Sequence, residues 1–305
     1  MINYNSGTAT VKLTLSARPP FSLPSVVRSH GWVRLVPFGE DERTGALTYV
    51  GRLDSGRVVE MRIQEAAGGI FVEVDGPLSE AERDEVAQKV EWMVGLNQSF
   101  ATFYALARKE PKLAHAEERA EGRLLRCPTL FEDTVKTILT TNTAWSGTIR
   151  MVEALVSQFG DPLPADTARH AFPTPNRLAA TDEETLRATA RLGYRAPYVL
   201  ELARAVASGA LDLESLKTAD VPTAQLRKQL LAIKGVGAYA AANLLVLLGR
   251  YDLIPVDSWA LKMVSHEWYN GKAVGRAEVE LAFEQWGEWK GLAYWLWDWS
   301  YTSKG

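Results

Sequence analysis

The stretch LLAIKGVGAYAAANLLVLLGRYDLIPVDSW, residues 230–259, decides how the rest of the chain is interpreted. The residues from Gly235 to Ala240 fit the dinucleotide-binding pattern G-x-G-x-x-A. Asp257 follows Gly237 by twenty residues, where that pattern places an acidic ribose ligand. The pattern also requires a β-strand that runs into the first glycine, so the residues before Gly235 decide between a cofactor site and another phosphate site.

The residues on both sides of the glycines are typical of helices. Before them, Leu226, Leu230 and Ile233 recur at i, i+4 and i+7 with polar residues between them, which indicates an amphipathic helix. After them, AYAAANLLVLLG is rich in alanine and leucine and is again helical. The glycines therefore join a helix to a helix, and a dinucleotide enzyme becomes the least favoured alternative.

A helical hairpin of this kind can bind one phosphate. Gly235 and Gly237 allow positive φ and close approach of a ligand, and the following helix presents free N–H groups and a positive dipole end. The alternative is a tight turn that needs glycine for geometry only. Residues 221–251 contain four basic side chains and no acidic one, which favours the phosphate.

Asp257 is expected at the start of a helix. Pro255 fixes an extended segment before it, and SWALKMVSHEW after it has helical periodicity. The residue is then an N-cap, which is the common role of such an aspartate. The other interpretation is an ionised carboxylate beside a bound phosphodiester.

Outward from this stretch, the chain divides into a β part and a helical part. Apolar residues alternate with polar ones up to about residue 77, which indicates an antiparallel sheet, and the capping box at Ser79 opens a helical region. The predicted fold is mainly α with an N-terminal antiparallel β domain, and two helical lobes enclose a cleft. The predicted domains are 1–78 and 79–305, the latter with a middle lobe at 126–221 and a hairpin lobe from 79–125 and 222–305. The residues that alternate are Val11, Leu13, Leu15; Val33, Leu35; Met61, Ile63; and Ile70, Val72, Val74.

Composition excludes several classes of protein. The 305 residues are 47% hydrophobic without an apolar run that could span a membrane, and no signal peptide is recognisable, so a cytoplasmic protein is expected. One cysteine, Cys127, cannot ligate an iron-sulfur cluster, and four scattered histidines give no metal-binding pattern. The net charge of -3 argues mildly against nucleic acid as a partner.

Four motifs in order resemble the helix-hairpin-helix (HhH-GPD) superfamily of DNA glycosylases. They are the KGVG hairpin with the IPVD segment, FEDTVKTILTTNTAWSGTIRMVEALVSQFG, FPTPNRLAATDEETLRATARLGYRAPYVLELARAV and WGEWKGLAYWLWDW. The resemblance covers roughly residues 100–300. With the N-terminal sheet, the chain is similar to the branch that contains 8-oxoguanine DNA glycosylase and 3-methyladenine DNA glycosylase II.

The resemblance assigns roles to residues of this chain. It implies that Asp257 is catalytic and that the hairpin binds a DNA phosphate; the hairpin residues are Lys234, Gly235, Val236, Gly237 and Ala238. It implies a structural Na or K ion held by the backbone carbonyls of Leu231, Ile233 and Val236. It also implies that Asn142, Tyr194 and Arg195 fill the gap left by the flipped nucleotide, although Asn142 could simply end a helix and Tyr194 could be core.

Two departures from the family pattern bear on the reaction. Members that also cut the backbone have a nucleophilic lysine where this chain has Tyr239, so a monofunctional enzyme is expected. The base pocket is expected at Tyr239, Asn243, Tyr294 and Asp298, and Gly147 replaces an arginine that would read an opposite cytosine. Aromatic rings with a carboxylate favour a cationic alkylated base.

The predicted function is therefore a monofunctional DNA N-glycosylase of base excision repair. Its expected partner is double-stranded DNA with a damaged base, and it is expected to act as a monomer, away from membranes, without a cofactor for catalysis. The alternatives are a glycosylase for oxidised or deaminated bases and a DNA-binding module that senses lesions without catalysis.

Overall fold

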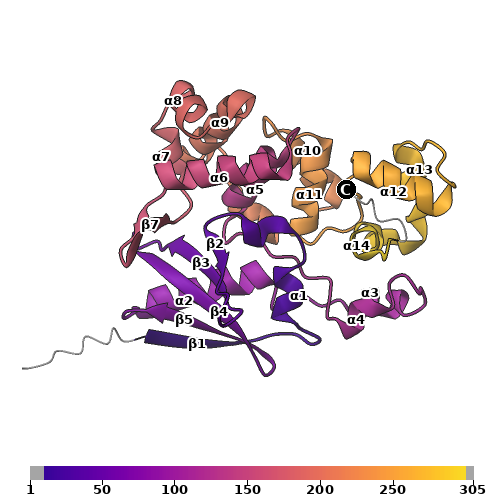
Figure 1. Cartoon of the computed structure of the whole chain (residues 1–305), viewed down its shortest axis with the longest axis horizontal. Coiled ribbons are helices and arrows are strands. Elements are labelled where there is room, and N and C mark those ends of the chain that lie inside the picture. Colours follow the sequence, from indigo (N-terminus) through magenta and orange to yellow (C-terminus); the bar gives the residue numbers. More distant parts are fainter. Residues whose placement is uncertain (1–9, 300–305) are drawn as a thin grey trace, which may run out of the picture.

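The computed structural model describes residues 10–299 (Figure 1). The chain begins with an antiparallel sheet of five strands in the order β1-β5-β4-β3-β2. Apolar residues alternate along its strands, so that one face is buried. The strands are β1 (Thr10–Ser16), β2 (Phe38–Glu40), β3 (Leu47–Arg52), β4 (Val58–Ala66) and β5 (Gly69–Asp75).

The strand predicted at Val33 and Leu35 is wrong. After the short helix α1 (Leu23–Val27), residues Gly31–Arg34 form the 3-10 helix η1. His30 caps this turn, because its Nδ1 accepts the backbone N–H of Trp32 at 3.1 Å. A local cap and the burial of Trp32 therefore decide the backbone conformation, and the alternating pattern does not.

Helix α2 (Glu80–Val94) packs against the sheet and starts at the predicted capping box. The Ser79 hydroxyl accepts the Glu82 N–H at 3.2 Å, and the Glu82 carboxylate accepts the Ser79 N–H at 2.9 Å. The helix ends at Gly95, where φ is 65°. Two short helices, α3 (Ala101–Ala107) and α4 (His115–Glu118), follow.

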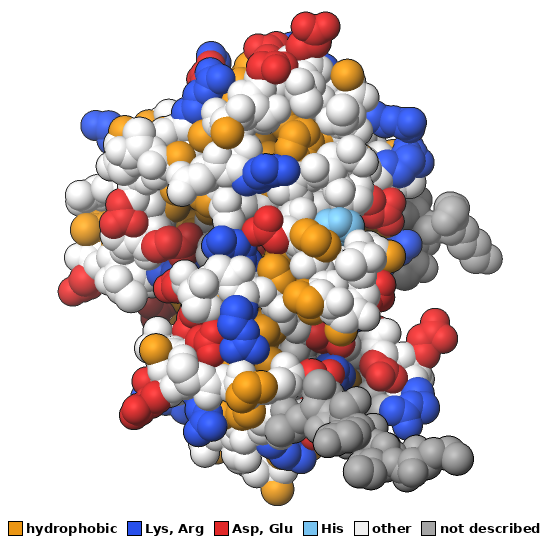
Figure 2. Space-filling model, turned by 90° about the vertical axis from the view of Figure 1, so that its left-hand side faces the viewer, with side chains coloured by type: hydrophobic (Ala, Val, Ile, Leu, Met, Phe, Trp, Pro, Cys, Tyr) orange, Lys and Arg blue, Asp and Glu red, His pale blue; other side chains and the backbone are white. Residues whose placement is uncertain are grey.

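The middle of the chain is helical except for a two-stranded hairpin that the sequence did not predict. Strands β6 (Pro162–Leu163) and β7 (Asp166–His170) lie between its helices. Ion pairs Arg169–Glu60 at 2.6 Å and Arg52–Asp161 at 2.8 Å join the hairpin to the sheet. Figure 2 shows this side of the molecule, where acidic and basic side chains are mixed. The helices are α5 (Leu130–Thr140), α6 (Trp145–Phe159), α7 (Pro175–Ala179), α8 (Glu183–Thr189), η2 (Gly193–Arg195), α9 (Ala196–Ala207) and η3 (Glu214–Thr218).

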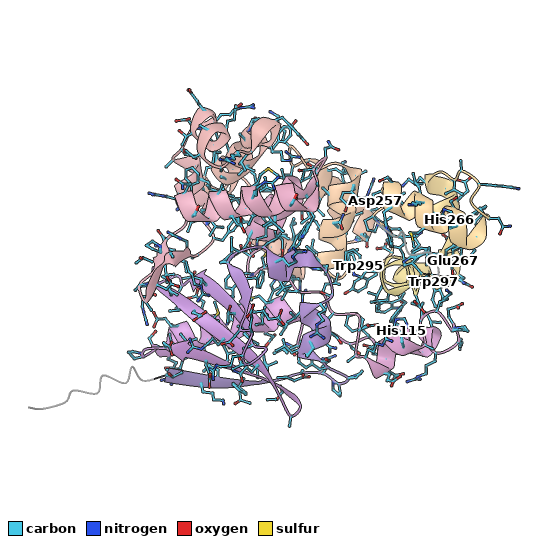
Figure 3. The ribbon with its side chains drawn as sticks, viewed as in Figure 1. His115, Asp257, His266, Glu267, Trp295 and Trp297 are labelled. Atoms are coloured by element: carbon cyan, nitrogen blue, oxygen red, sulfur yellow. The ribbon has the colours of Figure 1, made fainter. Side chains whose placement is uncertain are left out.

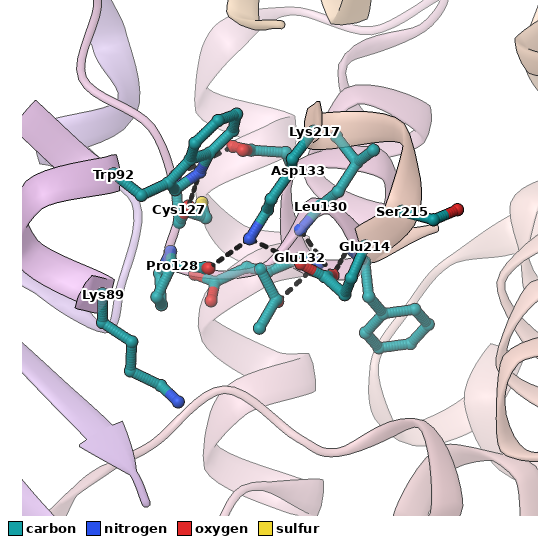
Figure 4. Close-up of polar contacts among 12 residues, drawn as sticks. Lys89, Trp92, Cys127, Pro128, Leu130, Glu132, Asp133, Glu214, Ser215 and Lys217 are labelled. Atoms are coloured by element: carbon teal, nitrogen blue, oxygen red, sulfur yellow. Dashed lines mark hydrogen bonds and ion pairs between the residues drawn. The ribbon is translucent and has the colours of Figure 1, made fainter. Parts of the chain in front are cut away.

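Helix α5 is buried along nearly its whole length, and η3 caps its N-terminus (Figure 4). The Glu214 carboxylate accepts the N–H groups of Leu130 and Phe131 at 2.8 and 3.3 Å. Lys217 Nζ donates to the Pro128 carbonyl at 2.7 Å. These bonds satisfy polar backbone groups that a buried helix end would otherwise leave without partners.

The last part of the chain contains the predicted helical hairpin. Helices α10 (Thr223–Leu231) and α11 (Ala238–Leu247) flank the glycines, and both sheets among residues 10–299 are antiparallel. The dinucleotide alternative is therefore excluded, because it needs a parallel sheet. The remaining helices are α12 (Ser258–Trp268), α13 (Arg276–Ala282), η4 (Glu284–Trp289) and α14 (Lys290–Leu296).

The predicted fold class, mainly helical with an N-terminal antiparallel sheet, is confirmed. In Figure 1, α7–α9 lie above and to the left of α6, the sheet lies below α5 and α6, and α12–α14 lie at the right of the molecule. Within residues 10–299, none of the helices combines the length and the apolar character needed to cross a membrane.

Arg123 holds the sheet domain and the helices together. The residue is 2% exposed, and its guanidinium donates to four backbone carbonyls from two segments of the chain. The fork of N–H donors suits this arrangement, which an ammonium cannot reproduce. The acceptors are the carbonyls of Gly95, Pro20, Arg18 and Gln98, at 2.9, 2.7, 2.6 and 2.8 Å.

We expect Arg123→Lys to lower the free energy of unfolding by roughly 2–4 kcal/mol, because several buried carbonyls lose their donors. Urea denaturation measures this change. Arg119→Lys is the matched control: the Arg119 side chain is 64% exposed, and its replacement should change stability by less than about 0.5 kcal/mol. Equal stability of the two variants would contradict the role of Arg123.

Candidate active site and DNA-binding surface

The two hairpin glycines have different roles. Gly235 has a φ of 88°, and a Cβ there would lie 2.8 Å from the Tyr198 ring, so no side chain fits. Gly237 is the N-cap of α11, and the position of its Cβ is open space. The first glycine shapes the turn, and the second leaves the end of α11 uncovered.

The end of α11 offers N–H groups to a ligand. The amides of Ala238 and Tyr239 donate to no acceptor in the part of the chain between residues 10 and 299, and no side chain caps this helix. Such amides, together with the helix dipole, favour an anion such as a phosphate. This arrangement fits the predicted phosphate site at the hairpin.

The hairpin is less basic than its sequence suggests. Lys234 forms an ion pair with Glu201 of α9 at 2.5 Å, which raises the pKa of the lysine. Arg250 donates to the Ala219 carbonyl at 2.7 Å. The stretch has no acidic residue of its own, but Glu201 from another helix lies beside it in the folded protein. The free amides therefore matter more for anion binding than the net charge of the stretch does.

The three carbonyls predicted to hold a monovalent cation lie in one turn. Leu231 is the last residue of α10, and the Ile233 carbonyl accepts the Val236 N–H at 3.0 Å. Across residues 10–299, no group of three or more His, Cys, Asp or Glu side chains is arranged to hold a metal ion. A cation at this turn would depend on backbone oxygens, and it stays a prediction.

Asp257 is the N-cap of α12, as the sequence predicts (Figure 3). Its Oδ1 accepts the N–H of Ala260 at 2.8 Å, while Oδ2 makes no hydrogen bond within residues 10–299. The carboxylate forms no ion pair there either. One oxygen therefore fixes the side chain, and the other remains available to a ligand.

Two phenols lie close to Asp257. Burial, and then the Asp257 carboxylate, raises the pKa of Tyr239 on α11 and of Tyr294 on α14. Tyr239 is 37% exposed, whereas Tyr294 is buried edge-on against Trp259, with 6.1 Å between the ring centroids. Trp259, two residues after Asp257, is 43% exposed, and the sequence analysis did not predict it here.

A cavity of about 330 Å³ adjoins Tyr239. Tyr239 and Asn243, both predicted for the base pocket, line it, and the Asn243 amide donates to the Tyr239 carbonyl at 3.0 Å. Tyr294 and Asp298 do not line it. The structure thus brings together two of the four predicted residues in this cavity.

Asp298 lies elsewhere in the molecule. Its side chain is exposed, its backbone N–H donates to the Lys112 carbonyl at 3.0 Å, and its own carbonyl accepts Lys112 Nζ at 2.8 Å. These bonds attach the end of α14 to the loop before α4. Asp298 therefore does not line this cavity, and its predicted role beside the base stays a prediction.

The other wall of the cavity comes from residues that the sequence analysis missed. His30 and Trp32 lie beside α5, where the Trp32 indole donates to Asp133 Oδ1 at 2.7 Å. Trp145 covers the backbone of Gly31, since a Cβ there would lie 2.5 Å from the indole ring. Two features of the sequence could have indicated this wall. They are the tripeptide His30-Gly31-Trp32 and Trp145, three residues after Asn142.

The three residues predicted to fill a gap in DNA contact one another. Asn142 has a φ of 47° and donates to the Tyr194 hydroxyl at 3.3 Å. The Arg195 guanidinium lies 4.4 Å from the centroid of the Tyr194 ring and donates to the Thr141 carbonyl. Tyr194 is 44% exposed, whereas Arg195 is 6% exposed, so the buried arginine packs against the inner face of the exposed tyrosine ring.

Tyr194 and the hairpin belong to one surface. The Tyr194 and Tyr198 rings meet edge-on with 6.2 Å between centroids, and Tyr198 packs on Gly235. Asn142 is thereby linked to the phosphate-binding hairpin through two aromatic rings. Residues that lie far apart in the sequence thus form a continuous path from the Asn142 loop to the hairpin.

Comparison with known proteins identifies the family. A family model described as HhH-GPD superfamily base excision DNA repair protein matches residues 135–288, about half of the chain. The chain belongs to this superfamily. The matched region contains the Asn142 loop, the Tyr194 segment, the hairpin and Asp257.

Curated relatives bear two kinds of name. The DNA-3-methyladenine glycosylase of Bacillus subtilis is 25% identical over 238 residues, covering 74% of this chain and 76% of the relative. The probable N-glycosylase/DNA lyase of Methanothermobacter thermautotrophicus is 25% identical over 236 residues, covering 70% and 73%. A solved structure, MBOgg1 in complex with a low affinity DNA ligand, is 25% identical with a TM-score of 0.72 and covers 95% and 94% of the two chains. The predicted family and the predicted enzyme class, a DNA N-glycosylase, are confirmed.

The contact between Gly31 and Trp145 can be tested by overpacking. We expect Gly31→Ala to lower the free energy of unfolding by about 1–3 kcal/mol, because the new methyl group displaces the Trp145 ring. In a Trp145→Phe background the same substitution should cost less, as measured by urea denaturation in a double-mutant cycle. An equal cost in both backgrounds would show that the ring does not cover Gly31.

Proposed function

We propose that this glycosylase is monofunctional and hydrolyses the N-glycosidic bond of a damaged base without cutting the DNA backbone. The observation that carries the proposal is the phenol of Tyr239 in the first turn of α11, beside Asp257. Cutting by β-elimination requires an amine that forms an imine with the sugar, and a phenol cannot form one. Because relatives include both glycosylase and lyase names, this side chain separates the two possibilities.

Asp257 is the proposed catalytic residue. Loss of the base develops positive charge on the sugar, which an ionised carboxylate stabilises. The Ala260 N–H holds one oxygen of Asp257, and the other is available to orient or deprotonate the attacking water. The neighbouring phenols are neutral at pH 7, since an ordinary phenol has a pKa of about 10 and burial and Asp257 raise the pKa of both further.

The damaged base is proposed to be alkylated. The cavity beside Tyr239 has aromatic walls that include Trp32, Trp145 and Trp295, and no carboxylate or ammonium group lines it. Flat aromatic walls attract a cationic ring through cation-π interaction, and no positive group in the lining would repel it. Oxidised and deaminated bases are the alternatives within the same function.

Contacts with DNA are proposed along the surface described above. The hairpin amides around Gly235, Gly237 and Ala238 bind one phosphate, and a sodium or potassium ion on the carbonyls of Leu231, Ile233 and Val236 would stiffen the turn. Tyr194 and Asn142 enter the gap that the extruded nucleotide leaves.

We expect Asp257→Asn to lower the rate of base excision by about 10²- to 10⁴-fold, because the charge is lost while the N-cap is kept. A panel of duplexes with alkylated, oxidised or deaminated bases, scored for alkali-labile sites against all four opposite bases, measures excision. Asp182→Asn is the matched control, since Asp182 caps α8 in the other lobe and accepts the Thr185 N–H at 2.7 Å.

Two outcomes of this panel are informative beyond the rate. Excision by Asp257→Asn at the wild-type rate would remove Asp257 from the mechanism. If neither protein excises any base while both bind duplexes equally well, the chain is a non-catalytic lesion-binding module.

Monofunctional hydrolysis predicts that borohydride traps no covalent complex with any excised substrate, and that the abasic product is cut only after alkali. Tyr239→Phe should behave in the same way, because neither ring can form an imine. A trapped band on a denaturing gel in the wild-type protein would overturn the monofunctional assignment, and peptide mapping would then identify the amine.

A further inference from the structure

Tyr239 belongs both to the cavity and to the surroundings of Asp257. Its side chain lines the cavity and is 37% exposed. Burial and then the Asp257 carboxylate raise the pKa of its phenol, so the two side chains lie close together. A nucleotide with its base in the cavity and its sugar at Asp257 would therefore have its glycosidic bond beside Tyr239.

Helix α14 connects the cavity and Asp257 a second time. Trp295 lines the cavity, and the preceding residue, Tyr294, packs edge-on against Trp259 with 6.1 Å between the ring centroids. Burial and then Asp257 raise the pKa of Tyr294 as well. Figure 3 shows Trp295 and Asp257 in the same part of the molecule. Helices α11 and α14 therefore both reach from the cavity to Asp257.

The Tyr239 hydroxyl has a proton available for a ligand. The phenol is neutral at pH 7, because burial and Asp257 raise its pKa, and the Asn243 amide opposes this shift as an N–H donor to the phenol oxygen does. No acceptor for the hydroxyl proton is found in the chain between residues 10 and 299. An amide that donates to the phenol oxygen leaves the phenol's own proton free to donate.

The charge of the departing base decides whether such a donor matters. When the bond between the sugar C1′ and the base nitrogen breaks, its electron pair leaves with the base. A cationic alkylated base then becomes neutral, whereas a neutral base becomes an anion. A hydrogen-bond donor placed where negative charge develops therefore stabilises the transition state mainly for neutral bases.

The cavity wall suits neutral bases as well as cationic ones. Its aromatic side chains can stack on either kind of ring; they include Trp32, Trp145 and Trp295. Among the described residues, no carboxylate or ammonium group lines it, so a neutral ring would bury no unpaired charge there. Selection between bases can then take place at the glycosidic bond, beside Tyr239.

We propose that the Tyr239 hydroxyl donates a hydrogen bond to the departing base, which allows the site to release neutral damaged bases in addition to cationic ones. This inference rests on the proposed function of the cavity. The attacking water forms the new bond to C1′ and gives a proton to Asp257, and the released base takes a proton from the solvent. The phenol keeps its own proton throughout, since a phenol with a raised pKa is a weak acid.

The test compares Tyr239→Phe with Tyr294→Phe. Both substitutions remove a hydroxyl near Asp257 and keep the ring, but Tyr294 is 6% exposed and does not line the cavity. Single-turnover excision is measured on duplexes that contain 7-methylguanine, which is cationic, or the neutral bases hypoxanthine, 8-oxoguanine and uracil. Thermal unfolding and duplex binding establish that each variant is folded.

We expect Tyr239→Phe to slow the excision of neutral bases about 10- to 100-fold more than that of the cationic base, because only an anionic leaving group needs the donor. The difference should grow as the released base becomes a poorer leaving group. Tyr294→Phe should change all rates by one common factor. A residue that only shapes the pocket would show no such dependence on the leaving group.

Several results would overturn the inference. One is a common factor for every base in Tyr239→Phe, and another is a leaving-group dependence that Tyr294→Phe shares. Excision of the cationic base alone by the wild-type protein would also overturn it, and would leave the proposed function intact. If the wild-type protein excises no base, the proposed function fails and the inference fails with it.

Discussion

The hydrogen bond from the Trp32 indole to Asp133 is the contact on which the cavity depends. It joins a short segment of the N-terminal domain to the buried helix α5, and it orients one wall of the cavity. Burial raises the pKa of Asp133 to about 6, although the N–H groups of Trp32 and Cys127 favour its ionised form. Loss of the bond from Trp32 would leave the buried Asp133 carboxylate with fewer partners, which is unfavourable. The hydrogen bond therefore holds the segment that carries Trp32 and His30 in a specific place.

Side-chain packing connects the hairpin to the Tyr194 segment. Gly235 takes its positive φ because it has no Cβ, and the Tyr198 ring, which also contacts Tyr194, occupies the space where a Cβ would lie. Lys234 is already paired with Glu201, so anion binding at the hairpin depends on backbone amides. Amides have a fixed direction, which a flexible lysine lacks, so a phosphate bound there would set the register of DNA relative to the cavity.

The sequence predicts those features that local chemistry decides. The helices around the glycines, the capping box at Ser79 and the N-cap at Asp257 follow from spacing and from side chains that bond to nearby backbone. The strand at Val33 fails because a buried indole overrides alternation. The wall formed by His30, Thr137 and other distant residues was not predicted, since it results from packing between segments about a hundred residues apart.

The surroundings of Asp257 limit the roles that it can have. Its carboxylate is held by one backbone amide, forms no ion pair among residues 10–299, and lies near two neutral phenols whose pKa values burial raises further. A positive ligand in a partly buried site interacts more strongly with a carboxylate than it would in water. An extruded nucleotide supplies such a charge when its glycosidic bond breaks, and an alkylated base supplies it earlier. The phenol of Tyr239 therefore does more than replace an amine, because it places no positive side chain beside Asp257.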